Sequence, residues 1–195
     1  MPVRHLFDTA VLVLGVMVLT GCGKGDFSTP KGAARAFATA LENGDAETAK
    51  KACTGGDPKV IESLANGIGN LKKMRDAGIS KFGDEGKTIF SGSGDDFDMT
   101  KKLDDAVEKI DGDKATITAK DGKPMNLKKV DGDWKVDASE IAGAGGTVGA
   151  GMFDSMGKAA KEMTDEINAG KYKTAAEAKE AFGKKMFGGF GDMIK

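Results

Sequence analysis

The chain has few of the side chains on which catalytic and metal sites are most often built. Among 195 residues there is one histidine, one tyrosine, one tryptophan and two cysteines, and the formal net charge is −1. A nearly neutral chain has neither a basic stripe for nucleic acid nor a strong field that would steer a charged substrate, so we expect no nucleic-acid partner. Glycine is abundant, at 29 residues, which favours one domain with a small core and many turns.

The apolar run near the amino terminus, residues 10–19, is too short to cross a membrane. Ten residues span about 15 Å as a helix, half of the hydrocarbon core of a bilayer. Arg4 and His5 precede the run and small residues follow it, an order that is typical of a signal peptide over residues 1–21. Cleavage would remove His5, and with it every histidine-based triad, metal site and acid–base mechanism.

The apolar run ends in "LTGC", residues 19–22, which resembles the lipobox of bacterial lipoproteins. The resemblance implies a diacylglyceryl group on the thiol of Cys22, cleavage before this residue and acylation of the new amino group. Two or three acyl chains anchor a protein stably, whereas one binds only marginally. Gly23 follows where inner-membrane lipoproteins often carry aspartate, so an outer-membrane location is expected in a bacterium with two membranes. The alternative is an ordinary secretory signal, after which Cys22 forms a disulfide.

Lipidation of Cys22 would leave Cys53 as a single thiol. With no histidine to activate it, we do not expect a nucleophile. Ala46, Ala49 and Cys53 fall on one face of a predicted helix, so Cys53 is interpreted as a small, buried and reduced side chain.

Helices are predicted after a short tether, residues 22–28. Thr29 is placed to cap the first helix and Pro30 suits its first turn. Asn43 and Gly44 end that helix, and Asp45 begins a second one that runs through the cysteine at position 53.

A third helix is predicted from Pro58, with an apolar face formed by Val60, Ile61, Leu64, Ile68 and Leu71. Gly67 and Gly69 each weaken this helix by about 1 kcal/mol relative to alanine. The third helix must therefore depend on packing.

From residue 87 the apolar pattern changes to that of strands. Five short segments, residues 87–92, 105–110, 114–119, 124–130 and 134–139, are separated by turns that include Asp-Gly pairs, which are strong hairpin signals. Alternation places Ala115 with Ile117, and Trp134 with Val136, on one face. The sequence therefore predicts an α+β fold, in which the preceding helices pack on a curved antiparallel sheet.

The stretch "STPKGAARAFATALENGDAETAKKAC", followed by a helix and a meander ending in "VDGDWKVD", resembles lipoproteins of the nuclear transport factor two-like superfamily. The resemblance covers about residues 27–139. It implies that residues 29–139 form a cone-shaped, cystatin-like domain, the fold also used by ketosteroid isomerase, whose sheet curls around the helices. Many members of that superfamily are enzymes with a pocket in the cone.

Two motif-like stretches do not meet the requirements of the sites they suggest. After Asp96 and Asp98 come Thr100 and Lys101, where an EF-hand loop needs a further ligand and then glycine. The glycine-rich residues 140–151 lack the Lys-Ser/Thr pair of a phosphate loop and the glycine spacing of a dinucleotide site, so a flexible linker is predicted there. We expect no metal and no cofactor, and no carboxylate stands out as the base of an isomerase.

Residues 152–195 are predicted to form a helical carboxy-terminal appendage. Its first helix carries an apolar stripe formed by Met152, Met156, Ala159, Met163 and Ile167. Thr174 and Glu177 form a capping box for a second helix that bears Ala178 and Phe182. Tyr172, the one tyrosine, lies in this appendage and so outside the predicted cone.

Together these patterns predict an extracytoplasmic lipoprotein of the cell envelope, anchored to the membrane through Cys22 and acting as a binding or scaffolding module with an envelope protein as its partner. Two alternatives stay open. One is a small-molecule enzyme, isomerase-like or hydrolase-like, that uses a pocket in the cone. The other is a structural component of the envelope.

Overall fold

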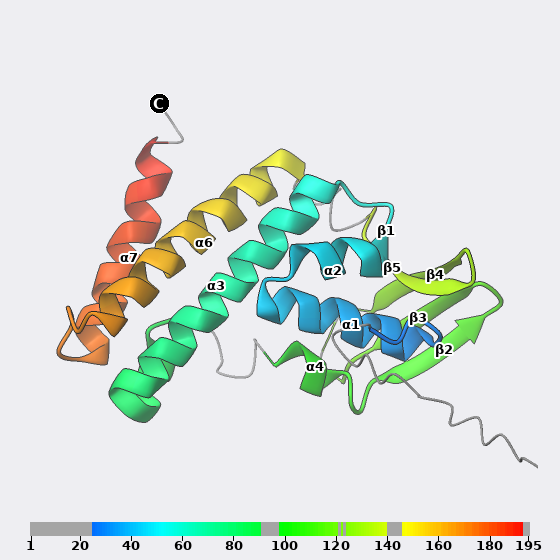
Figure 1. The fold of residues 1–195 in the computed structure, drawn as a ribbon, viewed down its shortest axis with the longest axis horizontal. Helices are drawn as coiled ribbons and strands as arrows, with labels where there is room; N and C mark the ends of the chain where they lie inside the picture. The colour runs from blue at the N-terminus through cyan, green and yellow to red at the C-terminus, as the bar shows by residue number, and fades with distance from the viewer. Residues whose placement is uncertain (1–24, 91–97, 121, 123, 140–145, 193–195) are drawn as a thin grey trace, which may run out of the picture.

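The fold is α+β, as the sequence predicts, with one layer of helices on a sheet and a second group of helices beside it (Figure 1). This computed structural model describes residues 25–90, 98–120, 122, 124–139 and 146–192, apart from the side chains of 146–148 and 187–192. The helices are α1 (Pro30–Asn43), α2 (Ala46–Ala52), α3 (Pro58–Phe82), the 3₁₀ helix η1 (Gly83–Thr88), α4 (Met99–Lys102), α6 (Gly146–Asn168) and α7 (Ala175–Asp192). The strands are β1 (Cys53–Thr54), β2 (Val107–Asp111), β3 (Lys114–Thr118), β4 (Met125–Val130) and β5 (Asp133–Asp137).

The sheet has the order β1-β5-β4-β3-β2. Strands β2 to β5 form the predicted antiparallel meander, and positive φ angles at Gly112, Asp131 and Gly132 turn two of its hairpins. The sequence analysis did not predict β1, which pairs in parallel with β5 through Cys53 and Thr54. The prediction that α2 continues through Cys53 is therefore wrong, because this residue belongs to the sheet.

One face of the sheet is buried beneath α1 and α2. The residues that point to this face are at most 5% exposed: Ala115, Ile117, Leu127, Trp134 and Val136. Helix α1 has the predicted limits, since the Thr29 side chain accepts a hydrogen bond from the backbone N–H of Gly32 and Gly44 ends the helix at a φ of 71°. Phe37 and Leu41 of α1 complete this core.

Helix α3 contributes buried residues to two hydrophobic clusters. Its amino-terminal half gives Ile61 and Leu64 to the cluster beneath the sheet, and its carboxy-terminal half gives Leu71 and Met74 to a cluster with α6 and α7. Ile68 packs against both. The predicted appendage therefore lies along α3, on the side away from the sheet (Figure 1).

Two glycines of α3 allow neighbouring elements to approach its backbone closely. A Cβ on Gly67 would lie 2.9 Å from the carbonyl oxygen of Phe153 in α6, and Gly157 of α6 faces Gly67 in turn. A Cβ on Gly69 would lie 2.5 Å from the Cα of Gly44, the residue that ends α1. The expectation that α3 depends on packing is consistent with these contacts, since the glycines that weaken the helix are the points where it packs.

The helical carboxy-terminal region follows its predicted pattern in part. Met163 and Ile167 are buried, but Met152 is 44% exposed. The Thr174 hydroxyl accepts from the N–H of Glu177, whose carboxylate accepts from the N–H of Lys173. Helix α6 begins at Gly146, inside the stretch 140–151 predicted as a linker, so that prediction is wrong for its described part, residues 146–151.

The strand predicted over residues 87–92 is also wrong for its described residues, 87–90. Gly83–Thr88 forms η1, in which Gly86 packs on the backbone of Gly78 in α3. Ile89 follows and is 2% exposed within the cluster of α3, α6 and α7. This segment is therefore fixed by burial against helices, not by pairing with a strand.

Candidate functional site: an apolar cavity beside a lysine-lined pocket

The predicted anchor, Cys22, lies outside the described residues. The described chain begins nearby at Gly25, whose backbone lies so close to Ala36 of α1 that a Cβ would fall 2.3 Å from the alanine Cβ. The carbonyl of Phe27 accepts a hydrogen bond from the N–H of Trp134 at 2.8 Å. The last residues of the predicted tether, 25–28, are thus packed on the domain beside β5 and α1.

Among the helices that the structure describes, none combines the length and hydropathy that a membrane crossing requires.

An apolar cavity of about 150 Å³, open to solvent, lies between the helices and the sheet. We call it the apolar cavity. Its walls come from α1, from α4 and the residue after it, and from β3 and β4 with their flanking residues. The lining residues are Phe37, Ala38, Leu41, Met99, Lys102, Leu103, Ile117, Ala119 and Met125. Lys102 is the one ionisable residue among these described lining residues.

The wall formed by α4 is held against α1 by polar contacts. The Glu42 carboxylate accepts from the N–H of Thr100 at 2.9 Å and from its hydroxyl at 3.3 Å. Arg35 forms an ion pair with Asp104, and the ammonium of Lys31 donates to the Asp104 carbonyl at 2.7 Å. These contacts fix a four-residue helix that is too short to be stable alone.

A second pocket, of about 200 Å³, adjoins the apolar cavity. We call it the lysine pocket. Its lining residues are Lys101, Lys102, Asp105, Ala119, Lys120 and Gly122. Lys102 and Ala119 line both spaces, and the described lining of the lysine pocket includes three lysines and one aspartate.

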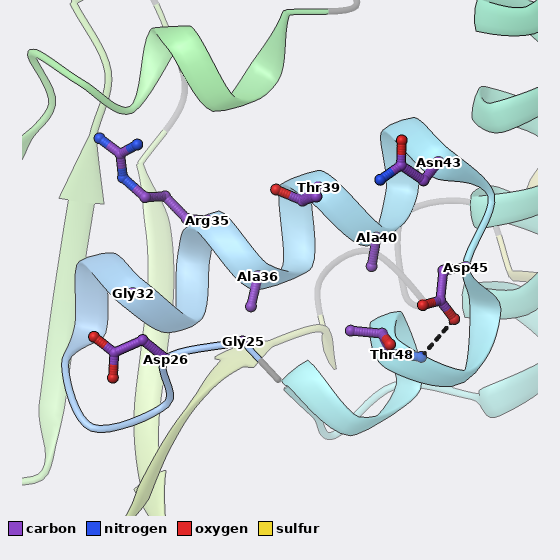
Figure 2. A pocket seen from close by; sticks show the side chains of 10 residues that line it. All are labelled: Gly25, Asp26, Gly32, Arg35, Ala36, Thr39, Ala40, Asn43, Asp45 and Thr48. Carbon is purple, nitrogen blue, oxygen red and sulfur yellow. Dashed lines mark hydrogen bonds between the residues drawn. The ribbon is translucent and has the colours of Figure 1, made fainter. Parts of the chain in front are cut away.

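A larger hollow of about 460 Å³ lies on the other side of α1 (Figure 2). Ala36 and Ala40 point from α1 toward Thr48 of α2, while Arg35 points away from them. The charged side chains of this hollow are engaged within the protein. Asp26 accepts from the N–H and hydroxyl of Ser28, Asp45 accepts from the N–H of Thr48, and Arg35 pairs with Asp104.

The hydrogen bonds from Ser28 hold the pKa of Asp26 below its ordinary value, and those from Thr48 do the same for Asp45. Both carboxylates are therefore ionised at neutral pH and already accept hydrogen bonds. Among its described lining residues, the hollow therefore has no carboxyl group poised to exchange a proton near pH 7.

The most strongly shifted pKa values belong to structural contacts. A hydrogen bond from Lys128, helped by Ser139, lowers the pKa of Asp137 to about 2. A hydrogen bond from Lys171, helped by Tyr172, lowers the pKa of Glu166 to about 2. Lys128 and Asp137 lie on neighbouring strands, whereas the contacts of Glu166 with Lys171 and Tyr172 join the end of α6 to the turn before α7.

Tyr172 therefore has a packing role. Burial, with a hydrogen bond to the Glu166 carboxylate, raises its pKa to about 12. It belongs to the cluster of α3, α6 and α7 and lines neither the apolar cavity nor the lysine pocket. It is not placed to act as a donor in a cone pocket.

Cys53 is half-buried, less than the sequence analysis expected, and it is a free thiol. Its thiol donates to the carbonyl of Lys50 at 3.7 Å. Burial raises the pKa of this thiol above its ordinary value, and a protonated thiol is a weak nucleophile. The prediction that Cys53 is not a nucleophile is consistent with this environment.

The acidic residues considered as metal ligands are dispersed. Asp96 lies outside the described residues, and the Asp98 carboxylate is 3.2 Å from the ammonium of Lys101. In the part of the chain that the structure describes, no three histidine, cysteine or carboxylate side chains lie close enough to share a metal ion.

Sequence reasoning missed the apolar cavity. Phe37 of α1, Met99 of α4 and Met125 of β4 come from separate segments, and no local spacing relates them. Nothing in the sequence indicated that Lys120 lines a pocket, because a single lysine after a strand is not a recognisable motif.

Comparisons of this chain with protein-family models, with curated proteins and with solved structures give no match.

Proposed function

We propose that this protein is a lipid-anchored, extracytoplasmic binding module that holds a small apolar group in the apolar cavity. The observation that carries the binding role is the cavity itself, an apolar space of about 150 Å³ between α1, α4, β3 and β4. An engineered protein cavity of this volume takes up benzene. The apolar cavity therefore suits a group of about six carbon atoms.

The expected affinity follows from the size of that group. Each buried methylene contributes about 0.8 kcal/mol, so six carbons contribute about 5 kcal/mol before the cost of immobilising the ligand. A free energy of about 4 kcal/mol corresponds to a dissociation constant of about 1 mM. Because the cost of immobilising the ligand is subtracted from this gain, we expect a simple six-carbon probe to bind with a dissociation constant of about 1 mM or weaker.

The lining favours binding over catalysis. An isomerase-like reaction needs a carboxylate base and acidic donors around the substrate. Among the described residues that line the apolar cavity, Lys102 is the one ionisable group. The described lining therefore contains no acid–base pair.

The anchoring role is supported by the resemblance of residues 19–22 to a lipobox and by the short path from Cys22 to the fold. Gly25 already packs on Ala36, and three residues span at most about 11 Å. An anchor on Cys22 would hold the domain close to the membrane.

The anchor is tested by replacing Cys22 with serine and following maturation and membrane association. We expect the Cys22→Ser protein to stay unprocessed and to carry no thioether-linked lipid by mass spectrometry. Cys53→Ser is the matched control, because it changes the other cysteine and should mature normally. Normal processing of Cys22→Ser would refute the anchor.

The binding site is tested with 1-hexanol and the protein labelled with carbon-13 at its methionine methyl groups. Signals of Met99 and Met125, which line the apolar cavity, should shift at millimolar hexanol, while that of Met163, buried in the other cluster, should not. Ala119→Leu should abolish the shift by filling the cavity. Thr118→Leu, which changes the preceding residue of β3, should leave it intact. Unmoved Met99 and Met125 signals would refute the site.

A further inference from the structure

We propose that a second copy of this chain pairs with the outer edge of β2, so that two β2 strands lie antiparallel about a twofold axis at Ile110. The order of the sheet places β2 at one of its edges (Figure 1). No residue of β2 belongs to the described linings of the apolar cavity and the lysine pocket. The interface is therefore separate from the proposed binding site and does not depend on it.

The outer side of β2 offers backbone groups to a further strand. Among the described strands, Val107–Asp111 pairs with β3 alone, and all five of its residues are exposed. Alternate residues of an antiparallel strand direct their N–H and C=O groups to opposite sides, so part of the β2 backbone points away from β3. The strand has neither a proline nor a bulge to interrupt it, and such an edge is a template for pairing with another chain.

Two apolar side chains of β2 are left uncovered. Val107 is 70% exposed and Ile110 is 53% exposed, and among the described residues they are two of the three large hydrophobic side chains that are exposed. Ile110 lies opposite Ala115, which is 4% exposed, and so points to the face of the sheet that α1 and α2 cover. The helices leave this face open at its edge, where a strand beside β2 would lie against Ile110.

The charges of β2 select the position of the axis. Opposed residues of an antiparallel pair point to the same face, so a twofold axis between two copies of β2 sets one residue opposite its own copy. An axis at Glu108 or Lys109 would set two like charges opposite each other, which is destabilising. An axis at either end residue would leave only that residue of β2 opposite β2 of the second copy.

An axis at Ile110 satisfies the side chains on both sides of it. Ile110 then faces its own copy, and Lys109 faces Asp111 of the second copy on each side of the axis. Within the described part of the chain, neither Lys109 nor Asp111 takes part in an ion pair. Glu108 needs no partner across the interface, because its carboxylate accepts a hydrogen bond from the backbone N–H of Lys31 at 3.1 Å. The strand is thus complementary to itself in this one arrangement.

Sedimentation equilibrium of the full chain tests the interface. We expect the average mass to rise from that of one chain toward that of two as the protein concentration increases from about 10 μM to about 1 mM, because a single pair of short strands forms a small and therefore weak interface. The urea midpoint of every variant is measured alongside, so that a loss of association is assigned only to a folded protein.

The variant Ile110→Lys tests the position of the contact. It sets two ammonium groups opposite each other at the axis and should weaken the dimer at least about tenfold. Met152→Lys is the matched control, because Met152 is also an exposed apolar residue, at 44%, but lies in α6. This control should leave the dimerisation constant unchanged.

An exchange of charges tests the alignment of the two strands. Lys109→Asp sets an aspartate opposite Asp111 of the second copy at both flanking positions and should weaken the dimer about tenfold, since two attractive pairs become repulsive. The double variant Lys109→Asp/Asp111→Lys makes these pairs attractive again and should restore the affinity to within about twofold of the parent.

The outcomes decide the proposal without bearing on the apolar cavity. A chain that stays monomeric up to about 1 mM, or a dimer that Ile110→Lys leaves intact, overturns the interface. A dimer that Lys109→Asp does not weaken, or that the folded double variant does not restore, overturns the axis at Ile110. Pairing of β2 with a strand of another protein, without self-association, overturns the second copy as its partner.

Discussion

Replacing Gly69 with alanine is expected to destabilise the protein, although alanine is the better helix former. Gly69 lies in the interior of α3 and is buried against the end of α1. Its new Cβ would fall 2.5 Å from the Cα of Gly44 and 2.6 Å from its nitrogen. These are backbone atoms, so two helices must move apart to make room.

The magnitude follows from two opposing contributions. Alanine gains about 1 kcal/mol of helix propensity over glycine, while overpacking of a close contact typically costs about 1–3 kcal/mol and occasionally more. Gly44 has little freedom to adjust, because its φ of 71° ends α1. We therefore expect a net loss of about 1–2 kcal/mol in the free energy of unfolding.

Urea unfolding of the purified chain measures this loss, with Gly183→Ala as the matched control. Gly183 lies in α7 and a Cβ there would meet no atom within 4 Å, so the same substitution should stabilise the protein by up to about 1 kcal/mol. The two variants should move the midpoint in opposite directions at a similar slope. If Gly69→Ala were as stable as Gly183→Ala, the close approach of α1 and α3 would be refuted.

Two further predictions concern titrating groups. Cys53 should react with a maleimide more slowly in the folded protein than in urea, because it is half-buried and its pKa is raised; equal rates would contradict its placement beside β5. The pKa of Glu166 is lowered from about 4.5 to about 2 on folding, so its stabilising contribution is complete at neutral pH and is lost as the pH falls through that interval. Glu166→Gln should therefore be about 1–3 kcal/mol less stable than the parent at pH 7, with the difference vanishing near pH 2; a difference that persists there would mean that the ion pair is not its source.

Local signals in the sequence were sufficient where the structure depends on neighbouring residues. Helix α1 begins after Thr29 and ends at Gly44 as predicted, and Asp-Gly turns join β2 to β3 and β4 to β5. Each of these features is decided within four or five residues, so the sequence shows it directly.

Non-local packing decided the features that the sequence analysis missed. Ile89 lies within the segment predicted as a strand, residues 87–92, but it is buried in the cluster of α3, α6 and α7. Gly146 begins a helix within a glycine-rich stretch, and that helix is supported further along, where Gly157 meets Gly67. The linings of the apolar cavity and the lysine pocket are likewise assembled from segments that no short pattern connects.

The parallel pairing of β1 with β5 also constrains the order in which the chain can fold. Cys53 pairs with Val136, 83 positions further along, so β1 has no partner until nearly the whole meander has been made. Until then the apolar side of α1, with Phe37 and Leu41, has no sheet to cover. Such long-range closure slows folding and leaves apolar surface open to association with other chains. If the chain emerges with its amino terminus first, its apolar surface would therefore have to be shielded from aggregation until residue 137 has also emerged.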